Sequence, residues 1–299
     1  MRSLSILITG LFLATSSLAC CIVPNIPDIN IDINIPTIEV GEMQTKREEI
    51  PLSGAEFATV NILFGAGELE IEAGEADTLL AARFRYNVEQ WEPIVAYDDG
   101  VLTVEQGGVK GNWGIPTGNT RNDWNLKFSP AALLEIDLDL GAGKGDLDFT
   151  GLQITALDVD AGAGNFNIHF DEPVKTKMEN LALNAGASKI EITGIGNVSP
   201  EQVKVQGGVG DITLDFTGDW ARSADVQITA GVGSLTLRLP DDVGIEVKTE
   251  GGLTNVDVEG LRREGNAYVN DAFGDTEIEV RIAITTGIGN LRLIEVAND

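Results

Sequence analysis

A stretch of alternating apolar and polar residues that turns at a glycine and then alternates again occurs eight times along the chain. The first copy spans 60–71 and has apolar residues at every second position on either side of its glycine. A period of two is typical of β-strands with one buried face, and glycine allows backbone conformations closed to other residues. Each copy therefore predicts a strand, a sharp corner and a second strand. The predicted corners are Gly65, Gly143, Gly162, Gly186, Gly208, Gly231, Gly252 and Gly287.

The corners from Gly143 to Gly252 recur about every 22 residues. A fixed period of this size is typical of a solenoid, whose stacked coils bury together an apolar face that no coil buries alone. We therefore expect an all-β fold, a single-chain β-solenoid of strand–glycine corner–strand coils. The chain has 35 glycines among 299 residues, well above the usual share of about 7%, as so many corners require.

Two long intervals interrupt the repeat. The first, between Gly65 and Gly143, contains alternating segments at 79–88, 91–97 and 101–106, which predict an antiparallel β meander. The irregular, glycine-rich segment 107–123 follows it. The second interval, 261–277, precedes the last copy. Because an open sheet edge invites pairing with other chains, we expect both inserts to cover the ends of the solenoid.

The N-terminus carries a targeting pattern. Arg2 precedes the apolar run 4–14, which has the length of a signal-peptide core and is too short to span a bilayer. The following Ser17-Leu18-Ala19-Cys20-Cys21 fits either an ordinary cleavage site or a bacterial lipobox, whose cysteine becomes lipidated. No other cysteine exists, and neighbouring cysteines cannot staple a fold. We therefore expect lipidation at Cys20, with Cys21 as the alternative.

These patterns divide the chain into four parts. We expect a signal peptide at 1–19, a lipidated extended tether at 20–41, an N-terminal β module at 42–135, and the solenoid with its C-terminal cap at 136–299. The predicted location is extracytoplasmic, with the lipid holding the protein on a membrane at the bacterial cell surface.

Composition excludes several functions. The net charge of −27 argues against nucleic acid as a partner, because phosphates would be repelled. One histidine and two adjacent cysteines leave few designs for metal or histidine-dependent chemistry. Aspartate pairs such as Asp137/Asp139 and Asp158/Asp160 recur with no cleft implied, so solvated strand faces explain them, and His169 is expected to point outward. We predict no catalytic residue, no metal site and no cofactor.

One segment differs from the acidic body. The stretch around Gly107–Trp124 combines two tryptophans with positive charge, and loops carry function more often than cores do. Its candidate binding residues are Lys110, Trp113, Arg121 and Trp124. Aromatic and cationic groups together suit an envelope glycan or protein partner. The alternative is that the tryptophans are structural plugs over the open end of the solenoid.

A family resemblance follows from particular segments. Phe64-Gly65-Ala66-Gly67-Glu68-Leu69 with Phe84–Pro93 resembles the N-terminal module of bacterial toast-rack proteins. The Gly-x-Gly ladder, which closes at Gly287-Ile288-Gly289-Asn290-Leu291, is similar to their solenoid body. That body in turn resembles adhesin-like proteins and the C-terminal domain of LiaF-like antibiotic-response proteins. The resemblance covers roughly 42–296 and implies a β-solenoid outside a bacterial membrane, with no active-site motif to carry over.

Three functions stay open on the sequence. The leading hypothesis is a non-enzymatic envelope lipoprotein that serves as an interaction or adhesion scaffold. The LiaF-like resemblance implies, as an alternative, a protein that senses or regulates envelope stress. A polysaccharide-active enzyme on a β-helix is a third hypothesis, which requires acidic and basic residues gathered on one groove.

Overall fold

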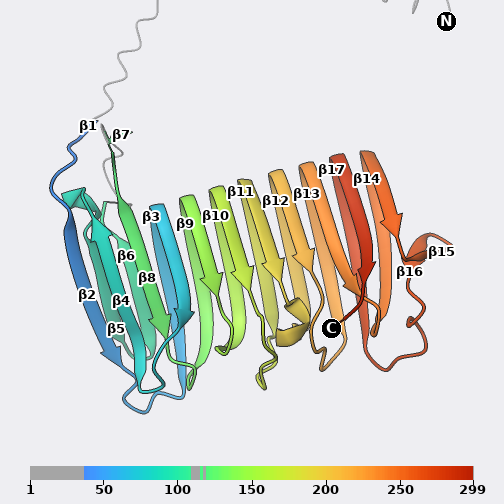
Figure 1. The fold of residues 1–299 in the computed structure, drawn as a ribbon, viewed down its shortest axis with the longest axis horizontal. Helices are drawn as coiled ribbons and strands as arrows, with labels where there is room; N and C mark the ends of the chain where they lie inside the picture. The colour runs from blue at the N-terminus through green and yellow to red at the C-terminus, as the bar shows by residue number, and fades with distance from the viewer. Residues whose placement is uncertain (1–36, 109–114, 117–118, 299) are drawn as a thin grey trace, which may run out of the picture. The chain divides into compact units, whose positions relative to one another are not determined.

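The structure, a computed structural model, describes residues 37–108, 115–116 and 119–298. Thr37 begins a compact unit that extends to the C-terminus, and Figure 1 shows its strands standing side by side as a rack. Fifteen strands form one continuous sheet, and β1 (Thr37–Ile38) pairs separately and in parallel with β7 (Ile115–Pro116). Two short 3-10 helices, η1 (Glu89–Trp91) and η2 (Ile195–Val198), complete the elements. In the described part of the chain, no helix is long and apolar enough to cross a membrane.

Each coil is one long strand that folds over at its middle, so the sheet becomes two facing layers. The residues before the bends form the first layer and the residues after them form the second layer. Neighbouring coils pair in parallel along both halves. The long strands are β3 (Phe57–Ala73), β9 (Leu133–Asp148), β10 (Gln153–His169), β11 (Asn180–Thr193), β12 (Gln202–Asp215), β13 (Ala224–Pro240), β14 (Gly244–Glu259) and β17 (Glu279–Val296). The all-β solenoid predicted from the periodicity is confirmed.

The core lies between the two layers. In β10, Leu157 and Val159 point inward before the bend, and Phe166 and Ile168 point inward after it, all with no measurable exposure. The alternate residues of both layers face solvent. The other coils repeat this arrangement, except that β14 buries apolar side chains only before its bend, and the buried side chains form one continuous cluster from β3 to β14.

The bends contain two columns of glycine. In the first column, an added Cβ at Gly162 would lie 2.2 Å from the carbonyl oxygen of Gly141, so only glycine allows the coils to approach this closely. In the second, Gly233 has a φ of +139°. Gly65, Gly162, Gly186, Gly208, Gly231, Gly252 and Gly287 lie in the first column, as predicted. The prediction for Gly143 is off by two residues: it pairs with Gly164 in the second column, and Gly141 takes its place in the first.

The N-terminal insert is divided between the layers. β5 (Pro93–Asp98) and β6 (Val101–Gln106) form the expected antiparallel hairpin, which extends the first layer through a parallel β3–β6 pair. The other layer continues from β3 through β8 (Asn122–Phe128) and β4 (Thr78–Tyr86) to β2 (Gln44–Pro51). The insert therefore differs from a continuous meander, because β4 pairs with β8 and β2 rather than with β5.

The C-terminal end departs from sequence order. The last strand, β17, lies between β13 and β14, so the final coil of the chain is the next-to-last coil of the rack. β15 (Arg262–Glu264) and β16 (Ala267–Val269) form a hairpin that covers only Glu246–Lys248 of β14. In the described chain, the second half of β14 pairs on one side alone, with β17, and so leaves an open edge in the second layer.

Candidate functional site

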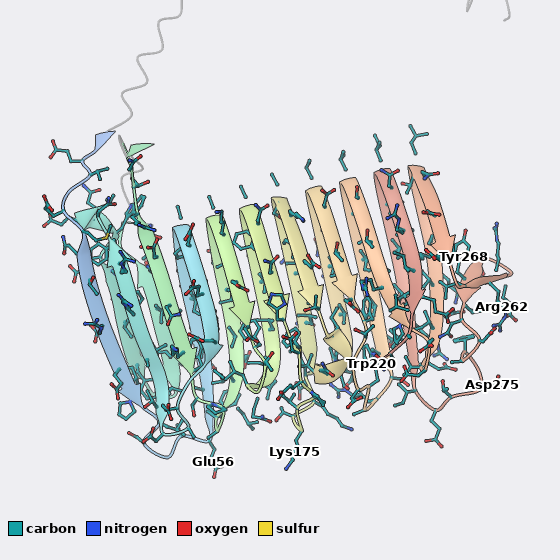
Figure 2. All side chains as sticks on the ribbon, in the orientation of Figure 1. Glu56, Lys175, Trp220, Arg262, Tyr268 and Asp275 are labelled. Atoms are coloured by element: carbon teal, nitrogen blue, oxygen red, sulfur yellow. The ribbon has the colours of Figure 1, made fainter. Side chains whose placement is uncertain are left out.

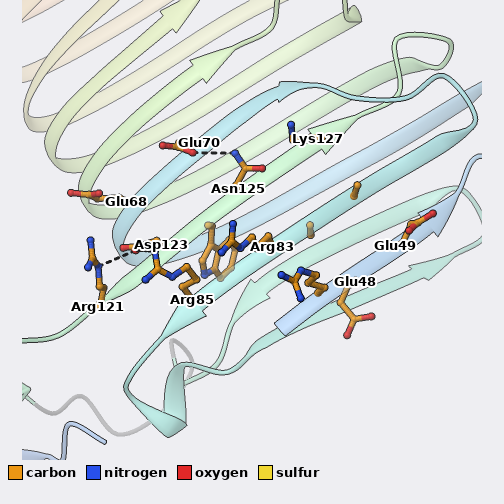
Figure 3. A pocket seen from close by; sticks show the side chains of 14 residues that line it. Glu48, Glu49, Glu68, Glu70, Arg83, Arg85, Arg121, Asp123, Asn125 and Lys127 are labelled. Carbon is orange, nitrogen blue, oxygen red and sulfur yellow. Dashed lines mark hydrogen bonds and ion pairs between the residues drawn. The ribbon is translucent and has the colours of Figure 1, made fainter. Parts of the chain in front are cut away.

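The outer face of the second layer is hollowed where the insert joins the solenoid (Figure 3). This groove has a volume of about 830 Å³ and lies across β2, β4, β8 and β3. Its lining includes five basic side chains, Arg47, Arg83, Arg85, Arg121 and Lys127. A quarter of the chain's 20 lysines and arginines thus gathers at one place on a protein of net charge −27. The acidic side chains of the lining are Glu48, Glu49, Glu68, Glu70 and Asp123.

Strand pairing brings these residues together from distant parts of the sequence. Arg47 of β2 lies directly opposite Arg83 of β4, and Arg83 lies opposite Asn125 of β8. Asn125 in turn pairs with Glu70 of β3 and donates a 3.0 Å hydrogen bond from Nδ2 to its Oε2. Directly opposite side chains on one face have Cβ atoms about 5 Å apart. The two arginines therefore form the basic end of a row that becomes acidic toward the solenoid.

Most cations of the groove are paired. Arg121 Nε lies 3.0 Å from Asp123 Oδ2, and Arg85 Nη1 lies 3.9 Å from the same oxygen. Lys127 Nζ lies 2.8 Å from Glu72 Oε1. Its hydrogen bond, together with one from Asn125, lowers the pKa of Glu72. Arg121, a predicted site residue, thus lies in the groove, as do Arg85 and Lys127.

Arg47 and Arg83 differ from the other cations. Both are exposed, and neither guanidinium has a hydrogen-bond or ion-pair partner among the residues that the structure describes. Like charges directly opposite each other on neighbouring strands destabilise a sheet. The pair therefore forms an uncompensated positive patch with room in front of it for an anion.

Trp124 forms part of the floor of the groove but is packed in the core. It is 1% exposed, and its ring packs edge to face against Phe64 and Phe84 with centroids 5.1 Å away in each case. Its indole Nε1 donates to Asn122 Oδ1 at 2.9 Å. Of the two interpretations of Trp124, the structure supports the structural one over the exposed binding residue, because Trp124 points inward from β8 together with Leu126 and Phe128. Lys110 and Trp113 lie outside the described residues.

A buried polar network fixes the insert to the first bend. Gln106 Oε1 accepts hydrogen bonds from the backbone N–H groups of Gly65 and Ala66, at 2.9 and 3.1 Å, and from Asn122 Nδ2 at 2.9 Å. Asn122 Nδ2 also donates to the carbonyl of Ala66 at 2.8 Å. Because each buried polar atom has a partner, the network specifies where β6 and β8 meet β3. No sequence pattern indicated that Gln106 and Asn122 would meet.

A second polar face lies on the first layer. Asp137 and Asp139 of β9 pair in register with Asp158 and Asp160 of β10. Partial burial and the neighbouring Asp160 raise the pKa values of Asp137 and Asp158. His169 is on the opposite layer, where its Nε2 lies 3.3 Å from Asp146 Oδ1. Among the residues described, no group of three or more histidine, cysteine or carboxylate side chains is arranged to hold a metal ion.

The fold and the groove define a toast-rack protein: folded coils with a two-branched β module at one end. A family profile described as the N-terminal domain of toast_rack, DUF2154, matches residues 39–193 and again 174–238. The chain belongs to this family. The sequence has no significant match among curated proteins.

Three solved structures are similar to this chain over most of its length. A candidate cell adhesion protein from Clostridium sporogenes is 24% identical, with 85% of this chain and 100% of that chain covered and a TM-score of 0.48. A candidate adhesin from Bacteroides fragilis is 14% identical, with 86% and 99% covered and a TM-score of 0.42. A candidate lipid-binding protein from Parabacteroides distasonis is 13% identical, with 86% and 99% covered and a TM-score of 0.44.

Proposed function

We propose that this protein is a non-enzymatic lipoprotein of the bacterial cell envelope whose groove binds an anionic polymer. The observation that carries the proposal is the Arg47–Arg83 pair, which is exposed, directly opposed and without a carboxylate partner in the described part of the chain. An anion that bridges the two guanidinium groups would relieve their repulsion. Arginine suits carboxylate and phosphate groups in particular, because its planar fork of donors binds two oxygens at once.

The surroundings of the arginine pair favour an extended ligand. The groove is long enough to cross four strands and is open to solvent along the outer face of the second layer. Elsewhere the acidic surface of the protein repels polyanions. A polymer with spaced negative charges would therefore contact the protein here and leave the rest of the rack free. Trp124 contributes to the shape of the groove floor and not to stacking on a sugar, since it is buried.

Binding can be measured with polygalacturonate and polyphosphate as probes and neutral dextran as the reference. The test variant is Arg47→Gln with Arg83→Gln. The matched control is Lys175→Gln with Arg263→Gln, which removes the same charge from exposed positions far from the groove. Because a hydrogen bond to a charged group contributes about 1.5–3 kcal/mol, we expect the test variant to bind at least about tenfold more weakly than the control. Equal affinities of the two variants, or no binding of either polyanion to the wild type, would refute the proposal.

Membrane attachment is the second part of the proposal. Cys20 and Cys21 lie outside the described residues, and the lipobox-like Leu18-Ala19-Cys20-Cys21 supports lipidation. Replacing both cysteines with serine should release the protein from the membrane fraction. The mature wild-type protein should also show the mass of attached acyl chains, and an unmodified mass would contradict this part alone.

A further inference from the structure

The residue between the first and second columns of each bend is small at one end of the rack and large at the other. Four coils at the N-terminal end have alanine there: Ala66, Ala142, Ala163 and Ala187. The four coils at the other end have large aliphatic residues: Val209, Val232, Ile288 and Leu253. The latter pair in register, Val209 with Val232, Val232 with Ile288 and Ile288 with Leu253. We call these four side chains the aliphatic ridge.

The ridge is open to solvent. Val209, Val232, Ile288 and Leu253 are 58%, 49%, 57% and 80% exposed, which places them among the most exposed large apolar residues of the described chain. Three strand spacings of about 4.8 Å make the ridge about 14 Å long. At least one neighbour in sequence of each ridge residue is a glycine, which has no side chain to cover the ridge residue. Isolated apolar residues are ordinary on a protein surface, but a contiguous exposed row marks an interaction site.

The ridge lies on the bend edge of the rack, the edge at which the described chain begins, but at the end away from the N-terminal insert. Gly41 donates a 2.7 Å backbone hydrogen bond to Asn87, whose side chain accepts from the backbone N–H of Arg121. The neighbouring Asn122 contacts the first bend at Ala66. Figure 2 places Glu56, Lys175 and Asp275 at the opposite edge, among the loops that connect the coils. The described chain therefore begins at the bend edge of the rack.

We propose that the aliphatic ridge inserts into the surface of a lipid bilayer with neutral headgroups. This inference goes beyond polymer binding and does not depend on the groove. A stable protein interface buries about 800 Å² on each partner, whereas the ridge is a single side chain wide. A fluid bilayer requires no matching shape and accepts such a row among its headgroups.

The charges near the ridge favour neutral over anionic lipid headgroups. The bend segments 206–211, 229–234, 250–255 and 285–290 contain no lysine or arginine, while Glu250 and Asp211 lie close to the ridge. Anionic headgroups would be repelled by these carboxylates and by the net charge of the protein. With a lipid anchor at Cys20, the seventeen residues up to Thr37 span at most about 60 Å. The tether would thereby hold the ridge at a high local concentration near the membrane.

Flotation with phosphatidylcholine vesicles tests the proposal. The secreted form, from position 20 onward, would carry Cys20→Ser and Cys21→Ser so that no acyl chain contributes. The ridge variant adds Ile288→Ser and Leu253→Ser. The matched control adds Ala142→Ser and Ala163→Ser, which occupy the same bend position in coils outside the ridge. We expect the parent and the control to float with the vesicles, and the ridge variant to bind roughly tenfold less.

Each other outcome overturns the proposal. If the parent does not bind phosphatidylcholine, or if the ridge variant binds as well as the control, the ridge does not contact lipid. Stronger binding to vesicles that contain phosphatidylglycerol would contradict the charge argument. A concentration-dependent dimer that the ridge variant abolishes, without vesicle binding, would assign the ridge to a second copy of the chain. The Arg47→Gln, Arg83→Gln variant should float like the parent, so failure of one proposal leaves the other measurable.

Discussion

Gly233→Ala tests the physical basis of the folded coils. Gly233 has a φ of +139°, and an added Cβ would lie 1.8 Å from the carbonyl oxygen of Gly210 in the neighbouring coil. Real Cβ atoms keep at least 3.0 Å from such atoms, so the strands would have to part by more than 1 Å. Alanine therefore introduces two penalties, a strained backbone and a collision between two backbones.

The magnitude follows from these two effects. A non-glycine residue held in such a backbone region costs about 1–3 kcal/mol, and overpacking that rigid neighbours cannot relieve costs about 1–3 kcal/mol more. We expect Gly233→Ala to lower the free energy of unfolding by about 4 kcal/mol. The matched control is Gly151→Ala, because Gly151 has a φ of +78° and no atom within 4 Å of the added Cβ. The control should cost about 1–2 kcal/mol, from the left-handed backbone alone.

Urea denaturation followed by tryptophan fluorescence measures both effects. With a denaturant dependence of about 3 kcal/mol per molar urea, the midpoint should fall by about 1.3 M for Gly233→Ala and by about 0.5 M for Gly151→Ala. Buried Trp124 and Trp220, which lie far apart along the rack, report on unfolding of its two halves. Equal shifts for the two variants would show that close approach between coils does not constrain the bend, and the reasoning would fail.

Three further predictions address the core and the acidic face. Ser188 replaces the second bend glycine in β11, and its buried hydroxyl has no hydrogen-bond partner among the described residues. Ser188→Ala should leave thermal stability unchanged or raise it, and a clear loss would reveal a partner. Trp124→Ala should lower the free energy of unfolding by about 3–5 kcal/mol, whereas an unchanged urea midpoint would contradict its place in the core. Asp158→Asn should stabilise the protein at pH 7 by about 0.5 kcal/mol, because it removes a like-charge contact. The folded state raises the pKa of Asp158, so the folded wild type takes up a proton before the unfolded chain does as pH falls. The free energy of unfolding of the wild type therefore rises as pH falls from the raised pKa toward the ordinary pKa of aspartate. The difference in melting temperature between wild type and Asp158→Asn should therefore shrink between pH 7 and pH 4, and a constant difference would refute the assignment.

The sequence predicted the elements of the coil better than their register. The bends and the inward-facing residues follow from alternation and glycine alone. Gly141, Gly143 and Gly145 are spaced by two, so shifting the bend from one to the next leaves every side chain on its own face. Only the neighbouring coil distinguishes them: Gly143 pairs with Gly164, and Gly145 leaves the space that Phe166 fills. This explains why the prediction for Gly143 was off by two residues.

The strand order at the C-terminus could not be predicted from local pattern. β14 and β17 have similar alternation, and each could follow β13. The inward positions of β17 on either side of its bend are apolar and buried, which suits a strand with a neighbouring coil along each edge. The second half of β14 leaves Val256 38% exposed and carries outward charges such as Asp257 and Glu259, which suit an edge strand. The two strands differ in how much apolar surface each would expose at the end of the rack, and this difference is defined only once the coils are stacked.

The groove shows a similar limit. Alternation in β8, with Trp124, Leu126 and Phe128 at every second position, was a signal that could have placed Trp124 in the core. The arginine pair had no such signal, because Arg47 and Arg83 become neighbours only when β2 pairs with β4. A prediction of the groove required the pairing of β2 with β4, of β4 with β8 and of β8 with β3, and all three partnerships join segments far apart in the sequence.

The bends also explain why one position per coil is free to vary. Glycine is required in the first column by the carbonyl oxygen of the preceding coil, and in most second-column positions by a positive φ. Between the two columns, the four large aliphatic side chains are about half or more exposed. Alanine, valine, isoleucine and leucine all occupy this position in coils of the same geometry. A change there alters what the bend edge contacts without altering how the coil folds. The shift from alanine to large aliphatic residues is confined to one end of the rack, which packing within a coil does not explain and which the proposed membrane contact would.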